Sequence, residues 1–147
     1  MVTATTSLDR PKTSKPTREP LRVSFPGGMA IDAEYRGFTI RTDQDTAHGG
    51  AGAAPPPFDL FLASVATCAG YYALQFLRSR NLSTAGLGLS LEPLRDDASR
   101  RIGTLRLHVE LPEEFPDKYR RALARSIDQC AVKRHIVDPP SFELTLG

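Results

Sequence analysis

An uncharged stretch from Leu60 to Leu77 most constrains what this chain can fold into. Three prolines and Asp59 precede it, and Arg78 and Arg80 follow it. Proline fits the first turn of a helix, because its nitrogen carries no hydrogen and those positions lack an intrahelical acceptor. A carboxylate at the start and arginines at the end also complement the helix dipole. The stretch therefore predicts one long helix with both ends marked.

This predicted helix has no polar stripe, so it should be covered on nearly all sides. Its length meets the lower limit for a membrane span. We favour a buried helix of a water-soluble protein over a membrane span, because Ser64, Thr67, Gln75 and two tyrosines make the stretch more polar than a lipid-facing helix. A chain of 147 residues leaves few residues to cover such a helix on all sides. We therefore expect a partner subunit to cover part of it.

The formal net charge of +2 comes from the N-terminal tail, so the body of the chain is balanced. No basic field for nucleic acid is visible. Residues 1–20 are rich in Thr, Ser, Pro and Lys, which predicts a disordered N-terminal tail, and residues 21–147 are expected to form a single domain. The N-terminus lacks the apolar run of a secretory leader, and we expect a cytoplasmic protein.

Period-two alternation of apolar and polar residues predicts three strands before the long helix. They cover residues 21–25, 29–35 and 38–42, and the turns fall at Gly27-Gly28 and at Gly37. This pattern is typical of an antiparallel meander. A glycine-containing loop follows, but it lacks the lysine and hydroxyl pair of a phosphate loop and is interpreted as a connection.

After the long helix, leucines alternate over residues 87–91 and again over 102–111, which predicts a hairpin with an irregular step near Gly103. Asp117 is expected to cap an amphipathic helix that ends near Cys130, with an offset turn after it. Alternating Phe142, Leu144 and Leu146 predict a last strand. The fold class is therefore α+β, in the order βββ, buried helix, ββ, amphipathic helix, β.

Only two cysteines are present, Cys68 and Cys130. In a reducing compartment such a pair is either inert or redox-active, and a free cysteine is more often a small buried hydrophobe. Metal binding by both cysteines and one of His48, His108 or His135 lacks a recognised ligand spacing. We expect no metal and no other cofactor.

Two motifs give the chain a family resemblance. One runs from Pro57-Phe58-Asp59-Leu60-Phe61-Leu62-Ala63 to Cys68, and the other from Cys130-Ala131-Val132-Lys133-Arg134-His135 to Pro139-Pro140-Ser141-Phe142. With the order of elements, they resemble the OsmC/Ohr family, the osmotically inducible protein C and organic hydroperoxide resistance proteins. The likeness extends from about Leu21 to Leu146.

The resemblance implies an intertwined homodimer with two long central helices between curved sheets. It also implies a thiol peroxidase in which Cys68 attacks a hydroperoxide, becomes a sulfenic acid and condenses with Cys130 to a disulfide that an external thiol reduces. An apolar pocket around Cys68 would favour organic hydroperoxides. Candidate pocket residues are Phe58, Asp59, Phe61, Tyr71 and Tyr72, although the aromatic ones would serve equally as core.

The chain departs from the family at two activating positions. Met29 follows the Gly-Gly turn where the family has Arg, and Phe58 stands ten residues before Cys68 where it has Glu. Asp59, Arg36, Arg41 or a partner residue are the candidates to compensate. Lys133, Arg134 and His135 would stabilise a thiolate at Cys130 and make it the more reactive sulfur, unless they form an ordinary solvated basic turn.

Two functions from different classes follow. The first is a thiol-dependent peroxidase that reduces organic hydroperoxides through Cys68 and Cys130, in oxidative stress defence. The alternative is a non-peroxidatic OsmC-like protein that binds an apolar small molecule at the dimer interface, with both cysteines structural. Partners are then a second copy of the chain, the small molecule and, for the enzyme, an external thiol reductant. Neither nucleic acid nor membrane is expected as a partner.

Overall fold

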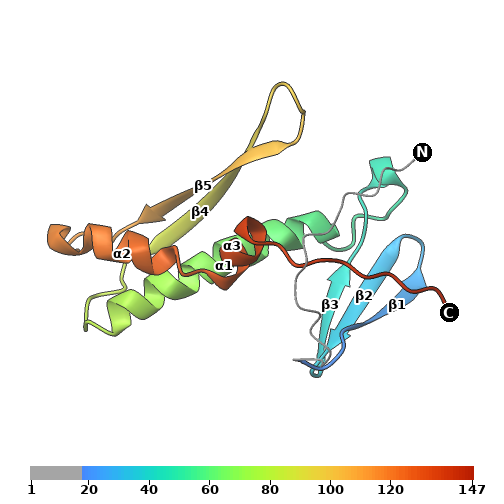
Figure 1. Cartoon of the computed structure of the whole chain (residues 1–147), viewed down its shortest axis with the longest axis horizontal. Helices are drawn as coiled ribbons and strands as arrows, with labels where there is room; N and C mark the ends of the chain where they lie inside the picture. The colour runs from blue at the N-terminus through green and yellow to red at the C-terminus, as the bar shows by residue number, and fades with distance from the viewer. Residues whose placement is uncertain (1–17) are drawn as a thin grey trace. The chain divides into compact units, whose positions relative to one another are not determined.

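The computed structural model describes residues 18–147, which form two compact units (Figure 1). The first unit ends at Pro57, and the second begins at Phe58. Residues 1–17 of the predicted tail lie outside the described residues. The single domain expected over residues 21–147 stays a prediction. Strands, a long helix, two further strands and short helices follow one another, so the α+β class is confirmed.

The first unit holds the predicted meander. Strands β1 (Arg22–Gly27), β2 (Ala30–Tyr35) and β3 (Phe38–Thr42) pair antiparallel in the order β1-β2-β3. Both turns need backbone in the left-handed region, where Gly28 has φ 58° and Gly37 has φ 82°. Glycine adopts this region without strain, which explains why these residues set the strand ends.

The two faces of this sheet differ in polarity. The register puts Val23, Ala33 and Ile40 in one cross-strand row and Arg22, Glu34 and Thr39 in the next. Since neighbouring rows point to opposite faces, one face is apolar and the other polar. The apolar face is open, with Val23 55% and Ile40 40% exposed, and no apolar side chain of residues 18–57 is buried.

A buried carboxylate organises the loop between β3 and the long helix. Asp43 is 3% exposed, and its carboxylate accepts hydrogen bonds from the backbone N–H groups of Gln44, Ala51 and Ala53 at 2.8, 3.1 and 3.1 Å. The hydrogen bond from Ala53, followed by those from Gln44 and Ala51, outweighs burial and lowers the pKa of this carboxyl group. The loop amides that a phosphate would need are therefore already occupied.

The second unit is built on α1 (Pro57–Arg78), with Asp59 in its first turn and Arg78 in its last, as predicted. Its buried residues follow one face, namely Val65, Ala69, Ala73, Phe76 and Leu77. The opposite face is open, and Tyr71 is 58% exposed. Complete coverage is therefore not reached within one chain, because the hairpin and the short helices leave that side open.

Helix α1 is also long and apolar enough to cross a membrane by length and composition. Its mean hydropathy is 1.5 over the most apolar window, of which 28% is buried here. Core helices of water-soluble proteins meet the same criteria.

Strands β4 (Gly88–Arg95) and β5 (Ile102–Glu110) form the predicted antiparallel hairpin. The register runs from Leu94 opposite Thr104 to Arg95 opposite Ile102, so Gly103 is an extra residue on β5. This bulge is the irregular step expected from the sequence. A Cβ atom at Gly103 would lie 3.0 Å from the Asp96 side chain, which explains the absence of a side chain there.

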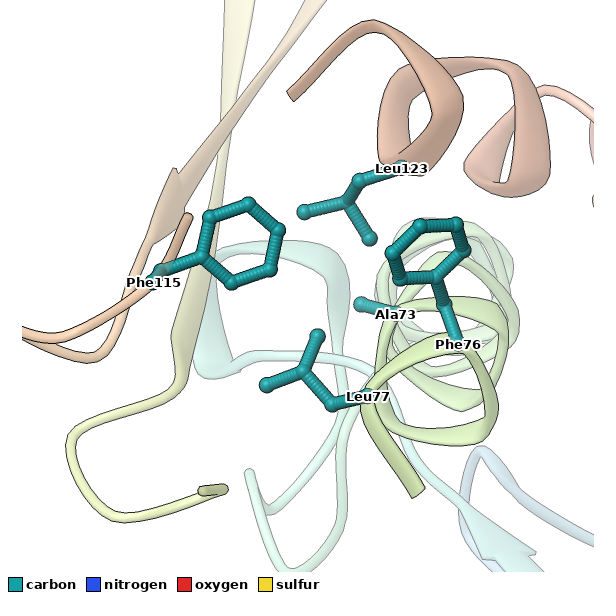
Figure 2. Close-up of a cluster of buried hydrophobic side chains, with 5 residues drawn as sticks. All are labelled: Ala73, Phe76, Leu77, Phe115 and Leu123. Carbon is teal, nitrogen blue, oxygen red and sulfur yellow. The ribbon is translucent and has the colours of Figure 1, made fainter. Parts of the chain in front are cut away.

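The helices after the hairpin complete a small core. A 3₁₀ turn, η2 (Asp117–Tyr119), leads into α2 (Arg120–Ile127), and α3 (Ala131–Val137) follows as the offset turn. Figure 2 shows Leu123 of α2 and Phe115 packing against Ala73, Phe76 and Leu77 of α1. These contacts fix α2 against the C-terminal half of α1.

Two expectations for this region are wrong. Asp117 caps no helix, because Pro116 takes the cap position and the Asp117 carboxylate pairs instead with Arg120 Nε at 2.7 Å. Residues 139–147 form no strand, and Phe142 and Leu146 are 94% and 91% exposed. A strand needs a neighbouring backbone to pair with, and in the described chain no strand lies alongside these residues.

Candidate functional site

Cys68 and Cys130 come from different elements of the second unit. Cys68 lies in the middle of α1 and is partly buried, while Cys130 is 1% exposed in the short link between α2 and α3. The core contacts that hold α2 on α1 also carry the following link towards α1. Local folding therefore brings the two cysteines to one place although they are far apart in sequence.

Cys130 is the N-cap residue of α3. Its backbone leaves the helical region at φ −46° and ψ 117°, and its sulfur accepts the N–H of Lys133 at 3.4 Å. Sulfur here takes the place of the oxygen that Ser, Asp or Asn usually supplies at a helix start. The cap fixes the direction of the Cys130 side chain and turns the first amides of α3 towards the same region.

The two thiols lie near each other, and each affects the pKa of the other. Burial raises the pKa of Cys68, but hydrogen bonds from the Cys130 thiol and from the N–H groups of Val132 and Ala131 outweigh it, so the pKa lies below the ordinary value. Burial raises the pKa of Cys130 too, and the hydrogen bond to Cys68 and the charge of its thiolate raise it further. Cys68 is therefore the more acidic thiol of the pair, and Cys130 is the thiol whose hydrogen bond favours the thiolate form of Cys68.

The pKa of Cys68 is thus lower than that of Cys130. The sequence had suggested the opposite, because basic residues follow Cys130. The ammonium group of Lys133 pairs with the Asp128 carboxylate, and Nδ1 of His135 lies 2.7 Å from the Ala131 carbonyl oxygen. These two groups therefore have other partners. The interpretation as an ordinary basic turn describes them better.

A groove in the second unit runs along the first part of α1 and ends about one helical turn before Cys68. Phe58 and Phe61, with ring centroids 5.4 Å apart, and Val65 line a cavity of about 790 Å³. The other candidate pocket residues lie elsewhere. Asp59 is exposed in the first turn of α1, Tyr71 lines a different hollow, and Tyr72 packs edge-on against Tyr71 at 5.3 Å.

Comparison with known proteins decides the family. The sequence matches the family model for OsmC-like proteins over residues 49–145, which is more than half of the chain. The chain belongs to the OsmC-like family. No protein among the curated sequences matches it.

Solved structures share the fold of this OsmC-like protein. One is a candidate osmotic stress induced and detoxification response protein from Psychrobacter arcticus 273-4, with a TM-score of 0.69 and 20% identity over 82% of this chain and 90% of that chain. Another is an organic hydroperoxide resistance protein OsmC from Legionella pneumophila, with a TM-score of 0.50 and 16% identity over 83% and 91%. At such identities the likeness concerns the fold alone.

The groups around Cys68 differ from those expected of the family. Phe58 puts an aromatic ring on the groove where the family resemblance calls for a carboxylate. The backbone N–H groups of Ala131 and Val132 and the Cys130 thiol instead favour the thiolate. Sequence reasoning missed these amides, and the available signal was the helix start directly after Cys130.

The described part of this OsmC-like protein offers no candidate metal centre. Within residues 18–147, no three or more His, Cys, Asp or Glu side chains are placed to hold an ion. His48 lies beside Asp45 at 2.6 Å in the first unit, whereas His135 bonds its own helix in the second.

The pKa order gives a direct prediction for alkylation. A thiol reacts as its thiolate, so we expect iodoacetamide to modify Cys68 with a midpoint below that of an unperturbed cysteine, and Cys130 only at higher pH. Peptide mapping of samples quenched between about pH 6 and 11 measures both rates and brackets both midpoints. In denaturant the two rates should converge. A Cys68 midpoint at or above the denatured value would contradict the assignment.

Proposed function

We propose that this OsmC-like protein is a thiol-dependent peroxidase that reduces organic hydroperoxides with Cys68 and Cys130, in oxidative stress defence. The observation that carries the proposal is that the two cysteines lie near each other, with the pKa of Cys68 below and that of Cys130 above the ordinary value. A pair of inert core cysteines requires neither feature. A nucleophile beside a protonated second thiol is what a two-cysteine peroxidase needs.

In the first step the Cys68 thiolate attacks the terminal oxygen of the hydroperoxide. An S–O bond forms and the O–O bond breaks, so sulfur loses two electrons and the alkoxide leaves and takes a proton from water as an alcohol. The N–H groups of Ala131 and Val132 and the Cys130 thiol hold the thiolate before the attack. Cys68 becomes a sulfenic acid.

In the second step Cys130 attacks the sulfur of that sulfenic acid. The S–S bond forms, and the sulfenic hydroxyl leaves with the Cys130 thiol proton as water. Two equivalents of an external thiol then reduce the disulfide and restore both cysteines. We place the reaction in the cytoplasm, where such thiols are abundant.

The proposed protein acts as a homodimer. OsmC family proteins are commonly dimeric, and the apolar face of the β1-β2-β3 sheet and the open side of α1 support a second copy as their cover. A sheet of three strands with one apolar face needs another layer to be stable. The exposed rings of Phe25 and Phe38, at 75% and 73%, would be unusual on a monomer.

Titration of free thiols tests this function. One equivalent of an alkyl hydroperoxide per chain should remove both thiols, lower the mass by two hydrogens and yield a Cys68–Cys130 peptide after digestion without reductant. A dithiol should restore the full titre. If peroxide leaves the number of free thiols unchanged, the protein is not a peroxidase of this kind. That result would favour the alternative, a protein that binds an apolar small molecule and whose cysteines are structural.

A further inference from the structure

The groove beside Cys68 combines an apolar floor with a cationic end. Phe58, Phe61 and Val65 of α1 form the floor, and Leu105 and Leu107 of β5 face it. Its volume of about 790 Å³ falls in the range of small-molecule sites. Since Phe58 is 53% and Phe61 37% exposed, this floor is accessible in the chain.

Three arginines close the groove at the tip of the β4–β5 hairpin. Arg95, Arg100 and Arg101 line it, and no acidic side chain does. Within residues 18–147 no ion pair engages these arginines, and the one contact among them is from Arg95 Nη1 to the Arg100 carbonyl oxygen at 3.4 Å. Asp96 in the same turn is turned to the backbone, where it accepts the Ser99 N–H at 2.7 Å. Three arginines against Asp96 and Asp97 therefore leave a net charge of +1 over residues 95–101.

The other end of the groove is lined by Val65 and Lys133, which are close in sequence to the two cysteines, although neither cysteine lines it. Val65 lies three residues before Cys68, one turn and about 4.5 Å along the helix axis. Lys133 also lines the groove, and its backbone N–H donates to the Cys130 sulfur. Because the ammonium group of Lys133 pairs with Asp128, this residue adds mainly its carbon chain to the wall.

We propose that this groove binds an anionic amphiphile, with its carboxylate or phosphate group among Arg95, Arg100 and Arg101 and its hydrocarbon chain over Phe58, Phe61 and Val65. Guanidinium groups bind both kinds of oxyanion through paired hydrogen bonds, and the aromatic floor buries the chain. The end of the chain then points along α1 to Cys68. The role of this molecule as a hydroperoxide substrate rests on the function proposed above, whereas its binding does not.

Equilibrium binding of matched probes tests the site without any redox step. Calorimetry on the reduced full chain should give dodecanoate and dodecyl phosphate about tenfold or more higher affinity than neutral methyl dodecanoate. The triple variant R95Q/R100Q/R101Q should remove this preference and leave the ester unchanged. Comparison of dodecanoate with dodecyl phosphate decides which headgroup the arginines favour.

Arg106→Gln is the matched control. Arg106 lies on β5 between Leu105 and Leu107, so it points to the other face of the hairpin, where it pairs with Glu92 at 2.9 Å. This variant should bind dodecanoate as the unchanged chain does. Equal loss in Arg106→Gln, equal affinity for acid and ester, or a change of oligomeric state in the triple variant that shows a second copy to cover the groove would each overturn the proposal.

The two proposals fail separately. If a neutral alkyl hydroperoxide oxidises the thiols but dodecanoate does not bind, only the proposed site for an anionic amphiphile is refuted. If dodecanoate binds but no hydroperoxide oxidises the thiols, only the proposed peroxidase function is refuted.

Discussion

Replacement of Cys68 by serine is expected to lower hydroperoxide consumption by about a thousandfold or more, because serine at this position supplies no thiolate. The remaining Cys130 has its pKa raised by burial and is 1% exposed, so it cannot take over the attack. Consumption of an alkyl hydroperoxide with a dithiol reductant measures the loss. A Cys68→Ser protein with unchanged turnover would contradict the assignment of the nucleophile.

Cys130→Ser separates the two chemical steps. Serine keeps the helix cap that the Cys130 sulfur makes with the Lys133 N–H, so α3 should stay folded. This variant should consume one equivalent of hydroperoxide and stop at the Cys68 sulfenic acid, which a 1,3-dicarbonyl reagent traps for mass spectrometry. Cys130→Ala loses the cap and the hydrogen bond to Cys68, and should raise the pKa of Cys68 as well.

Local patterns were enough to predict most of the fold. Alternation at Val23 and Ile40 and the glycines at the turns predicted the meander, and the break near Gly103 is the bulge of the hairpin. These features depend on residues close in sequence or on a strict period of two. The last strand was wrong for the opposite reason, because alternation at Phe142 and Leu144 says nothing of a neighbouring strand to pair with.

The electrostatics of the cysteine pair could not be predicted in the same way. The sequence shows the charges of Lys133 and His135, but it does not show that these groups bond Asp128 and the Ala131 carbonyl. Backbone N–H groups carry no sequence signal, and those of Ala131 and Val132 act on Cys68 only because the cap at Cys130 turns the chain there. The motifs thus predict both cysteines as site residues, but they do not indicate which of the two has the lower pKa.

Introduction of a charge on the apolar face of the first sheet is expected to separate the proposed dimer. Ile40 lies in the row with Val23 and Ala33 and is 40% exposed in the single chain. If a second copy covers this face, Ile40→Lys buries an unpaired ammonium group and costs about 3–5 kcal/mol. Light scattering should then find monomers, and the midpoint of urea unfolding should fall.

Thr39→Lys is the matched control for that variant, because it adds the same charge at the adjacent position on the polar face. Thr39 Oγ1 donates to the Glu34 carboxylate at 2.7 Å, so a lysine there meets an opposite charge. Its effect should stay within about 0.5 kcal/mol, as is usual for an exposed position. If the apolar face were open to water in solution, Ile40→Lys would be equally mild. Equal behaviour of the two lysine variants would therefore remove the sheet from the dimer interface and leave the cysteine chemistry within one chain untouched.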